Sequence, residues 1–227
     1  MKQETLQFYF NNNKSDFFCV SKKNYFAYKS ISDWPNWSNK FIFLYGPKDC
    51  GKSHISNLWI KKSNAVKIDS YFFERLEINE NQILIEKNNK WLIEDIDEIL
   101  DSKILNIDMK ILNFLNLISK EHCFLLITSR NSPKNMFLSL EDLLSRLNSF
   151  LVVEIKEPDE DLLKKIIIKG LQIHQIEIDD EHIDYLINRM ERTYTSAKKI
   201  AYLIDKISLE KKINISKDFL KKILDNF

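Results

Sequence analysis

Gly46-Pro47-Lys48-Asp49-Cys50-Gly51-Lys52-Ser53 is the most specific stretch of this chain. It fits the pattern G-x-x-x-x-G-K-[ST] in full, directly after the apolar run 41–45 and directly before a segment with helical spacing. In such a loop, backbone N–H groups wrap phosphates and the helix N-terminus adds positive potential. Lys52 is then placed for the β- and γ-phosphates, and the Ser53 hydroxyl for Mg²⁺. The stretch therefore predicts a phosphate-binding loop between a strand and a helix.

Short apolar runs elsewhere in the chain have the length of strands, and segments with helical spacing alternate with them. One such segment, 107–119, places its apolar residues on one stripe. Strands and helices alternate in this way when the sheet is parallel, because parallel strands need crossover connections. We therefore expect an α/β fold with a P-loop parallel sheet and helices on both faces. The expected strands, each buried on both faces, are 41–45, 65–68, 91–93, 123–127 and 151–155.

The pattern changes after Pro158. Asp159 is suited to cap a helix that ends near residue 171, and apolar helical periodicity returns in three later segments, 183–190, 197–208 and 219–224. We see no strand in this part and expect a small all-α lid domain. The predicted division is an N-terminal segment of residues 1–14, a nucleotide-binding α/β domain of residues 15–157 and a helical domain of residues 158–227.

The composition argues against several classes of protein. The chain has 34 Lys and Arg against 33 Asp and Glu, so no global field would hold it on nucleic acid or on an anionic membrane. Its three cysteines have neither CxxC spacing nor paired histidines, which argues against a disulfide framework and a zinc site. The N-terminus lacks an apolar signal core, and the longest apolar runs are strand-sized. We expect a cytoplasmic protein with no membrane partner and no sequence-specific DNA binding of its own.

Two acidic residues, Glu94 and Asp95, follow the expected strand 91–93. A P-loop protein needs one carboxylate near Mg²⁺ and another to orient water. Because side chains alternate along a strand, only one of the two can point directly at the metal, and the sequence leaves open which one does. The acid-rich stretch continues through Asp97 and Glu98, so a solvated strand end is the alternative interpretation.

Thr128-Ser129-Arg130 ends the next core strand and places polar groups at the edge of the sheet where ligands of open α/β sheets bind. Arg146 lies in a predicted helix, 140–147, whose leucines face the core while the arginine projects. Without further context, an ordinary surface arginine would explain that position better.

Several stretches match a family pattern, although some of them have no chemical explanation of their own. They are Asp16-Phe17-Phe18-Cys19-Val20 with Asn24 and Ala27, Trp34-Pro35-Asn36-Trp37, Tyr45-Gly46-Pro47 through Gly51-Lys52-Ser53-His54, Glu94-Asp95-Ile96-Asp97, Ser145-Arg146-Leu147, Pro158-Asp159 and Arg189-Met190-Glu191-Arg192. Through these residues nearly the whole chain resembles the AAA+ module of the DnaA-related family. Within that family it looks most like the Hda type, in the alphaproteobacterial form called HdaA.

The resemblance implies ADP or ATP and Mg²⁺ as cofactors. It also implies that Arg146 is an arginine finger, which acts on nucleotide bound by a neighbouring subunit, with Asp95 and Glu94 as further catalytic residues. Ser53, Glu94 and Asp95 are the implied metal site. The segment around Phe18 to Asn24 is implied to contact the adenine. The implied nucleotide-binding residues are Phe18, Cys19, Asn24, Gly46, Pro47, Lys48, Asp49, Cys50, Gly51, Lys52, Ser53, His54, Thr128 and Thr195.

In Hda-like proteins the neighbouring subunit is ATP-bound DnaA, whose hydrolysis shuts down re-initiation. Such proteins dock on the DNA-loaded sliding clamp through an N-terminal motif that begins with Gln, which here is Gln7-Phe8-Tyr9-Phe10, with Gln7, Phe8 and Phe10 as the contacts. The motif departs from the family pattern, because phenylalanines stand where leucines are usual and Asn11 replaces proline. A frayed N-terminus is the alternative, and a homo-oligomer is a further possible assembly.

Three functions compete at this point. The first is a nucleotide-bound regulator that is tethered to the clamp and stimulates hydrolysis by DnaA in trans. The second is a self-contained ATPase, such as a helicase loader or a clamp-loader subunit. Thr195 falls where related ATPases carry a second-domain arginine, which favours the first function and predicts weak or absent intrinsic hydrolysis. The third, a truncated initiator that binds origin DNA, ranks last because the helical region ends at Phe227 and leaves no room for a separate helix-turn-helix domain.

Overall fold

The computed structural model describes residues 18–75, 88–120, 122–211 and 215–225. These residues form two compact units. One unit comprises residues 24–47 and 51–155 and is built on a sheet. The other comprises residues 18–23, 48–50 and 156–225 and is helical. The phosphate loop at 46–53 thus contributes residues to both units.

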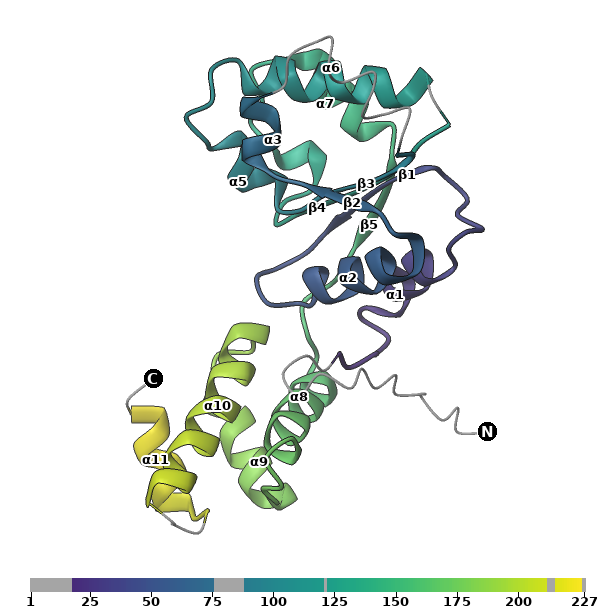
Figure 1. Cartoon of the computed structure of the whole chain (residues 1–227). Coiled ribbons are helices and arrows are strands. Elements are labelled where there is room, and N and C mark those ends of the chain that lie inside the picture. The colour runs from purple at the N-terminus through teal and green to yellow at the C-terminus, as the bar shows by residue number, and fades with distance from the viewer. Residues whose placement is uncertain (1–17, 76–87, 121, 212–214, 226–227) are drawn as a thin grey trace. The chain divides into compact units, whose positions relative to one another are not determined.

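The sheet has five strands in the order β2-β3-β4-β1-β5, and every pair of neighbours is parallel. Strand β1, which lies between β4 and β5, is in register with both neighbours, so that Phe43 pairs with Ile127 on one side and with Val152 on the other. Helices cover both faces of the sheet (Figure 1), which confirms the predicted α/β class. The strands are β1 Phe41–Tyr45, β2 Val66–Ile68, β3 Lys90–Ile93, β4 Phe124–Ser129 and β5 Leu151–Glu154.

The prediction that every strand is buried on both faces is confirmed for the central strands and is wrong for the edge strands. Phe43 and Leu126, in β1 and β4, are fully buried. In the edge strands, by contrast, Lys67 and Glu154 are exposed, and Val152 keeps 37% of its surface accessible. The strand order gives the reason, since β2 and β5 each have a neighbour on one side only in the part of the sheet that the structure describes.

Two helices of the sheet unit, α1 and α2, lie on one face, and α3, α5, α6 and α7 lie on the other (Figure 1). Helix α6 buries residues spaced at helical intervals along one side, with Phe114 packed edge-on against Phe73 and Trp91 at ring distances of 5.9 and 5.7 Å. The helices are α1 Tyr25–Ser32, α2 Lys52–Ser63, α3 Ser70–Glu74, α5 Ile96–Leu100, α6 Ile107–Lys120 and α7 Glu141–Asn148, with a 3₁₀ turn at Pro133–Asn135.

The Trp34-Pro35-Asn36-Trp37 stretch packs against the first of these faces. Trp37 stacks on Trp59 of α2 with ring centroids 4.8 Å apart, and Trp34 meets Phe124 of β4 edge-on at 4.6 Å. The Trp37 indole nitrogen also donates to the carbonyl of Ile31 at 3.0 Å. The stretch therefore anchors the segment between α1 and β1 onto α2, the helix that follows the phosphate loop.

The described part of the helical unit contains α8 Glu160–Gln172, α9 Asp180–Ile187, α10 Tyr194–Lys211 and α11 Lys217–Asp225, and no strand. Side chains at helical spacing, such as Leu163, Ile167 and Leu171 of α8, are fully buried. Asp159 caps α8, since its carboxylate accepts a hydrogen bond from the Leu162 N–H at 3.0 Å.

Replacing this cap should destabilise the helical unit measurably. An Asp159→Ala variant is expected to lose about 1 kcal/mol of unfolding free energy, because the first-turn N–H of Leu162 loses its acceptor. Chemical denaturation followed by circular dichroism measures the loss. Asp161→Ala is the matched control, since Asp161 is an exposed first-turn residue of the same helix. Equal losses in the two variants would contradict a capping role for Asp159.

Candidate nucleotide site

The phosphate loop connects β1 to α2. At its start, the N–H of Gly46 donates to the carbonyl of Ser129 at 3.3 Å, which ties the loop to the end of β4. Gly51, the residue before α2, has a φ of 100°, in the region that only glycine enters freely. The invariable glycine of the pattern thus has a backbone reason at this position.

Lys52 is turned back into the loop that it follows. Its side chain is buried, and its ammonium donates to the carbonyls of Gly46 at 2.9 Å and Pro47 at 3.1 Å. Because a lysine ammonium has three N–H donors, one remains for a ligand beside these two bonds. The positive charge is therefore held at the loop by backbone groups, as phosphate binding requires.

Glu94, at the end of β3, is half-buried and forms an ion pair with Lys67 of β2. Burial alone would raise the pKa of Glu94, but the bond from Lys67, the nearby Ser53 hydroxyl and the charge of Lys52 outweigh it, so the pKa lies below its usual value. The second carboxylate oxygen is buried and has no hydrogen-bond partner among the described residues. An anionic carboxylate with a spare oxygen beside the Ser53 hydroxyl fits Mg²⁺, which favours Glu94 as the residue on the metal side.

Asp95 is held in a different way. Its backbone adopts a left-handed conformation with φ 49°, and its N–H donates to the Thr128 hydroxyl at 2.8 Å. Burial is the main cause that raises the pKa of Asp95, and Glu94 and Glu98 add to it, while Lys52 and Arg130 act in the opposite sense. A carboxylate with a raised pKa accepts a proton more readily, which is the property of a general base.

Thr128 is fully buried, and the structure shows its hydroxyl bonded to the Asp95 backbone. Asp97 and Lys67, which were not among the predicted site residues, complete this edge of the sheet. Asp97 accepts from the Ser129 hydroxyl at 2.9 Å and from the Arg130 N–H at 2.6 Å. Lys67 has no sequence signal at all, because its pairing with Glu94 depends on the neighbouring strands β2 and β3.

Within the helical unit, Asp49 of the loop meets Thr195 of α10. The Thr195 hydroxyl donates to the Asp49 carboxylate at 2.7 Å. Asp49 has a left-handed backbone with φ 62°. The next residue, Cys50, is buried, and the neighbouring Tyr194 donates its hydroxyl to the Lys156 carbonyl at 3.0 Å. Burial raises the pKa of Tyr194, and the nearby Cys50 acts in the same direction.

The residues predicted to contact the adenine are all buried, two of them in the helical unit and one in the sheet unit. Phe18 and Cys19 lie in the helical unit, where burial raises the pKa of the Cys19 thiol against the opposing charges of nearby lysines, of which Lys169 has the largest effect. Asn24 is buried in the sheet unit, just before α1. His54 of α2 is half-buried and Lys48 is exposed.

Arg146 of α7 is where the expectation needs correction. Leu143 and Leu147 face the core as predicted. Arg146, however, does not simply project: it is half-buried, its guanidinium donates to the Ser119 hydroxyl at the end of α6, and its Nε atom is buried without a partner among the described residues. The helical period fixes which side of α7 is apolar, but it cannot show that a neighbouring helix supplies an acceptor. Gln7, Phe8 and Phe10 lie outside the described residues.

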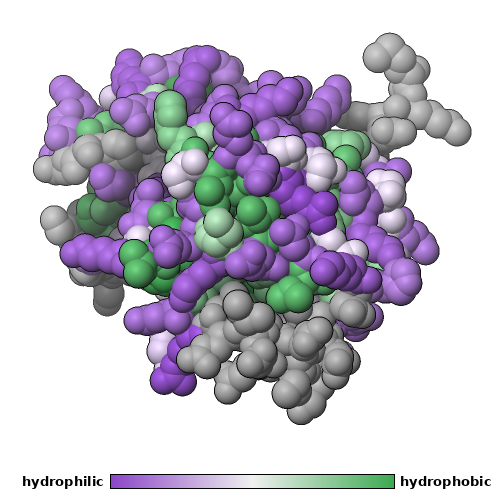
Figure 2. Space-filling view, turned by 90° about the horizontal axis from the view of Figure 1, so that it is seen from above, coloured by the Kyte–Doolittle hydropathy of each residue, from purple (hydrophilic) through white to green (hydrophobic). Residues whose placement is uncertain are grey.

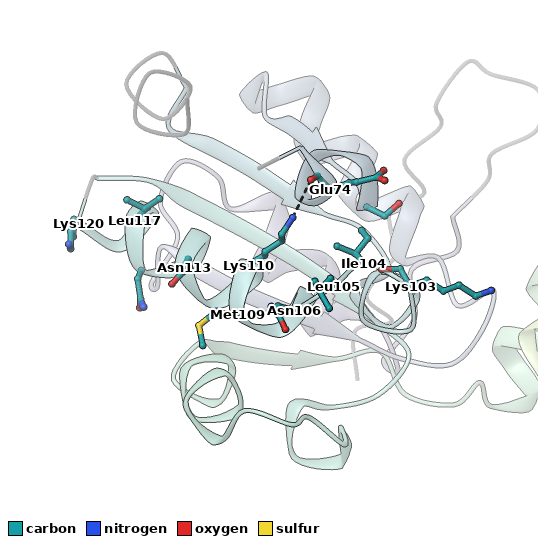
Figure 3. Close-up of a pocket in the computed structure, with 13 residues that line it drawn as sticks. Glu74, Lys103, Ile104, Leu105, Asn106, Met109, Lys110, Asn113, Leu117 and Lys120 are labelled. Atoms are coloured by element: carbon teal, nitrogen blue, oxygen red, sulfur yellow. Dashed lines mark hydrogen bonds between the residues drawn. The ribbon is translucent and has the colours of Figure 1, made fainter. Parts of the chain in front are cut away.

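A hollow of about 970 Å³ lies elsewhere in the sheet unit (Figure 3). Exposed Leu105 and Met109 line it together with Lys103, Lys110 and Asn113, and the Lys110 ammonium donates to the carbonyls of Phe73 and Glu74. None of the predicted site residues lines this hollow. Apolar side chains also gather into patches among hydrophilic ones on the face that Figure 2 shows.

No helix in the described ranges is both long and apolar enough to cross a bilayer. The same ranges hold no group of three or more His, Cys, Asp or Glu residues that could bind a metal. Mg²⁺ at a phosphate loop does not need such a group, because it keeps several waters and is held by one or two side chains together with the phosphates.

A parallel sheet with this strand order, a phosphate loop after β1 and a following set of helices define the AAA+ class of fold. The chain matches domain III of the replication initiation protein DnaA from Thermotoga maritima with a TM-score of 0.77 and 20% identity, over 92% of this chain and 94% of that one. It also matches AMPPCP-bound DnaA from Aquifex aeolicus, with a TM-score of 0.70 and 21% identity, over 86% of this chain and 66% of that one.

Comparison with curated sequences also finds DnaA among the relatives of this chain. The chain is 24% identical to DnaA of Nautilia profundicola over 226 residues, which cover 91% of this chain and 51% of that protein. It is 27% identical to an uncharacterized protein of Haemophilus influenzae over 197 residues, covering 82% of this chain and 81% of that protein. No protein-family model matches the chain. The two kinds of similarity support a DnaA-like AAA+ domain, and the chain spans about half the length of the DnaA relatives that it matches.

Proposed function

We propose that this protein is a nucleotide-binding regulator of replication initiation, which docks on the DNA sliding clamp and stimulates ATP hydrolysis by DnaA in trans. The observation that carries the proposal is the contact between Thr195 and Asp49 of the loop. A threonine carries no positive charge with which to stabilise the charge that develops on a transferring phosphoryl group. The protein therefore lacks at this position the cation that a self-contained ATPase would use on its own nucleotide.

The bound nucleotide in this proposal is ADP or ATP with Mg²⁺. The loop 46–53 holds the phosphates, with Lys52 as the cation, and Phe18, Cys19 and Asn24 contact the adenine. Ser53 and Glu94 hold Mg²⁺, which when bound offsets phosphate charge. Similarity to AMPPCP-bound DnaA and to DnaA bound to AMPPCP and single-stranded DNA supports an adenine nucleotide.

Arg146 supplies the active cation to DnaA. It lies on α7 of the sheet unit, and its bond to Ser119 gives the guanidinium a fixed starting position. A guanidinium held in place loses less side-chain freedom when it meets a phosphate than a fully mobile one would. The N-terminal residues Gln7, Phe8 and Phe10 provide the tether to the clamp, residues 15–157 the nucleotide-binding domain and residues 158–227 the lid.

A self-contained ATPase is the second candidate, and Asp95 is the observation that favours it. Its raised pKa and its backbone bond to Thr128 are properties of a positioned general base. Hydrolysis of ATP by the isolated protein discriminates between the candidates. Turnover at the ordinary rate of an AAA+ motor would favour this second function.

The proposed function is tested by measuring ATP hydrolysis by purified DnaA in three mixtures: alone, with this protein, and with this protein and DNA-loaded clamp. We expect strong stimulation only in the third mixture, because the clamp brings the two proteins to a high local concentration. Stimulation that is equal with and without clamp would contradict the tether. No stimulation in any mixture would contradict the regulatory function itself.

The tether makes a prediction of its own. A Gln7→Ala, Phe8→Ala, Phe10→Ala variant should bind purified clamp several hundredfold more weakly, because each aromatic anchor at an interface contributes roughly 2 kcal/mol. Surface plasmon resonance measures the affinity, and Asn12→Ala, Asn13→Ala is the matched control in the adjacent polar run. A lowered melting temperature with unchanged clamp affinity would show instead that the aromatic residues pack on the protein.

A further inference from the structure

Asp49 lies in the middle of the phosphate loop and has a left-handed backbone conformation. At its φ of 62°, glycine has no steric clash and aspartate is tolerated. A glycine would therefore satisfy the backbone better at this position. The presence of a carboxylate is not explained by the path of the loop.

The hydrogen-bond partner of this carboxylate is uncharged. Its partner is the hydroxyl of Thr195, which donates at 2.7 Å and carries no charge. None of the ion pairs found among the described residues includes Asp49. Lys52, three residues further along the loop, donates two hydrogen bonds to the carbonyls of Gly46 and Pro47. A negative side chain thus stands in the segment whose backbone is shaped to receive phosphates.

We propose that Asp49 is a specificity-determining residue of this loop, which disfavours a triphosphate relative to a diphosphate. The inference rests on the proposed binding of an adenine nucleotide. ATP brings one more negative charge to the loop than ADP does, and repulsion between like charges grows with each added charge. Because Asp49 is half-buried, solvent screens this repulsion only in part. The protein therefore retains ADP in preference to ATP.

Thr195 has a defined part in this selection. Its hydrogen bond directs the Asp49 carboxylate toward α10. Without the hydroxyl, the carboxylate is free to turn toward the phosphates, so the preference for ADP becomes stronger. The effect of Thr195 passes through Asp49, and it should vanish when Asp49 carries no side chain.

The test compares the affinities of full-length protein for Mg-ADP and Mg-AMPPCP, the latter as a triphosphate that is not hydrolysed. Asp49→Asn removes the charge and keeps an acceptor for Thr195. We expect it to improve AMPPCP binding about tenfold and ADP binding about threefold, with smaller gains at high salt. Asp49→Gly should likewise improve AMPPCP binding more than ADP binding. Thr195→Val should lower the ratio of AMPPCP affinity to ADP affinity in the wild type and leave that ratio unchanged in the Asp49→Gly background.

Two controls separate charge from other effects. Asp101→Asn removes a carboxylate from the exposed end of α5, and Asn106→Gly relieves a left-handed residue outside the loop. Neither should alter the ratio of the two affinities. An unchanged ratio in Asp49→Asn, with binding that still requires Lys52, would overturn the selection by Asp49 and leave the nucleotide site in place. Failure of every variant, including the wild type, to bind either nucleotide would overturn both proposals.

Discussion

Arg146→Ala should abolish most of the stimulation of DnaA hydrolysis while leaving ADP affinity nearly unchanged. An arginine finger supplied in trans contributes roughly 10³ to 10⁵ in rate in other phosphoryl-transfer systems, so this is the largest effect that we expect from a single substitution. The readout is phosphate release by DnaA in the presence of the variant and DNA-loaded clamp. Unchanged stimulation by a folded variant would refute the assignment.

The surroundings of Arg146 determine the controls. Since Arg146 is half-buried and bonded to Ser119, its removal also changes packing between α7 and α6, and the melting temperature must be measured beside the rate. Arg146→Lys keeps the charge but loses the planar fork, so it should recover only a small part of the stimulation. Ser119→Ala removes the acceptor and keeps the finger. It should preserve most of the stimulation.

Lys52→Ala should lower ADP affinity by about a thousandfold. Truncating one partner of a buried, hydrogen-bonded charge pair costs roughly 2–5 kcal/mol, and the substitution also leaves the Gly46 and Pro47 carbonyls without their donor. In the wild type, ADP at a hundred times its Kd should stabilise the fold by about 2.7 kcal/mol. The variant should lose most of this stabilisation, which differential scanning fluorimetry records as a missing shift in melting temperature.

Lys61→Ala is the matched control, because Lys61 is an exposed lysine at the other end of the same helix. It should keep the full ADP shift. An equal shift in Lys52→Ala and in the wild type would contradict nucleotide binding by the loop 46–53. If Lys52→Ala does not fold in the absence of ADP, the two bonds from Lys52 to the loop carbonyls are needed mainly for stability.

The positions of the strands could be predicted from the sequence because each buried strand is a short apolar run between turns. The expected run 41–45 is strand β1, and 91–93 differs from β3 by a single residue. What the runs could not provide is the order of the strands. That order decides that Val152 lies at an edge, so its exposure became visible only with the structure.

In the candidate site, too, contiguous features could be predicted from the sequence and contacts between distant residues could not. The loop is contiguous in sequence, so its glycines, Lys52 and Ser53 could be predicted from spacing alone. The pairs Lys67–Glu94 and Asp95–Thr128 join positions 27 and 33 residues apart, and only the sheet brings them together. Spacing therefore predicted which acids stand at the sheet edge but not their different environments, one anionic beside Lys67 and the other with a raised pKa.

The edges of the sheet bear on how the protein behaves at high concentration. An exposed strand edge offers unpaired N–H and C=O groups on which a second chain can build intermolecular β-structure. Strand β2 is only three residues long and carries exposed Lys67 at its middle, and β5 is four residues long and ends in exposed Glu154. Short, charged edges are poor templates for a foreign strand. Association through β-aggregation is therefore disfavoured at both ends of the sheet.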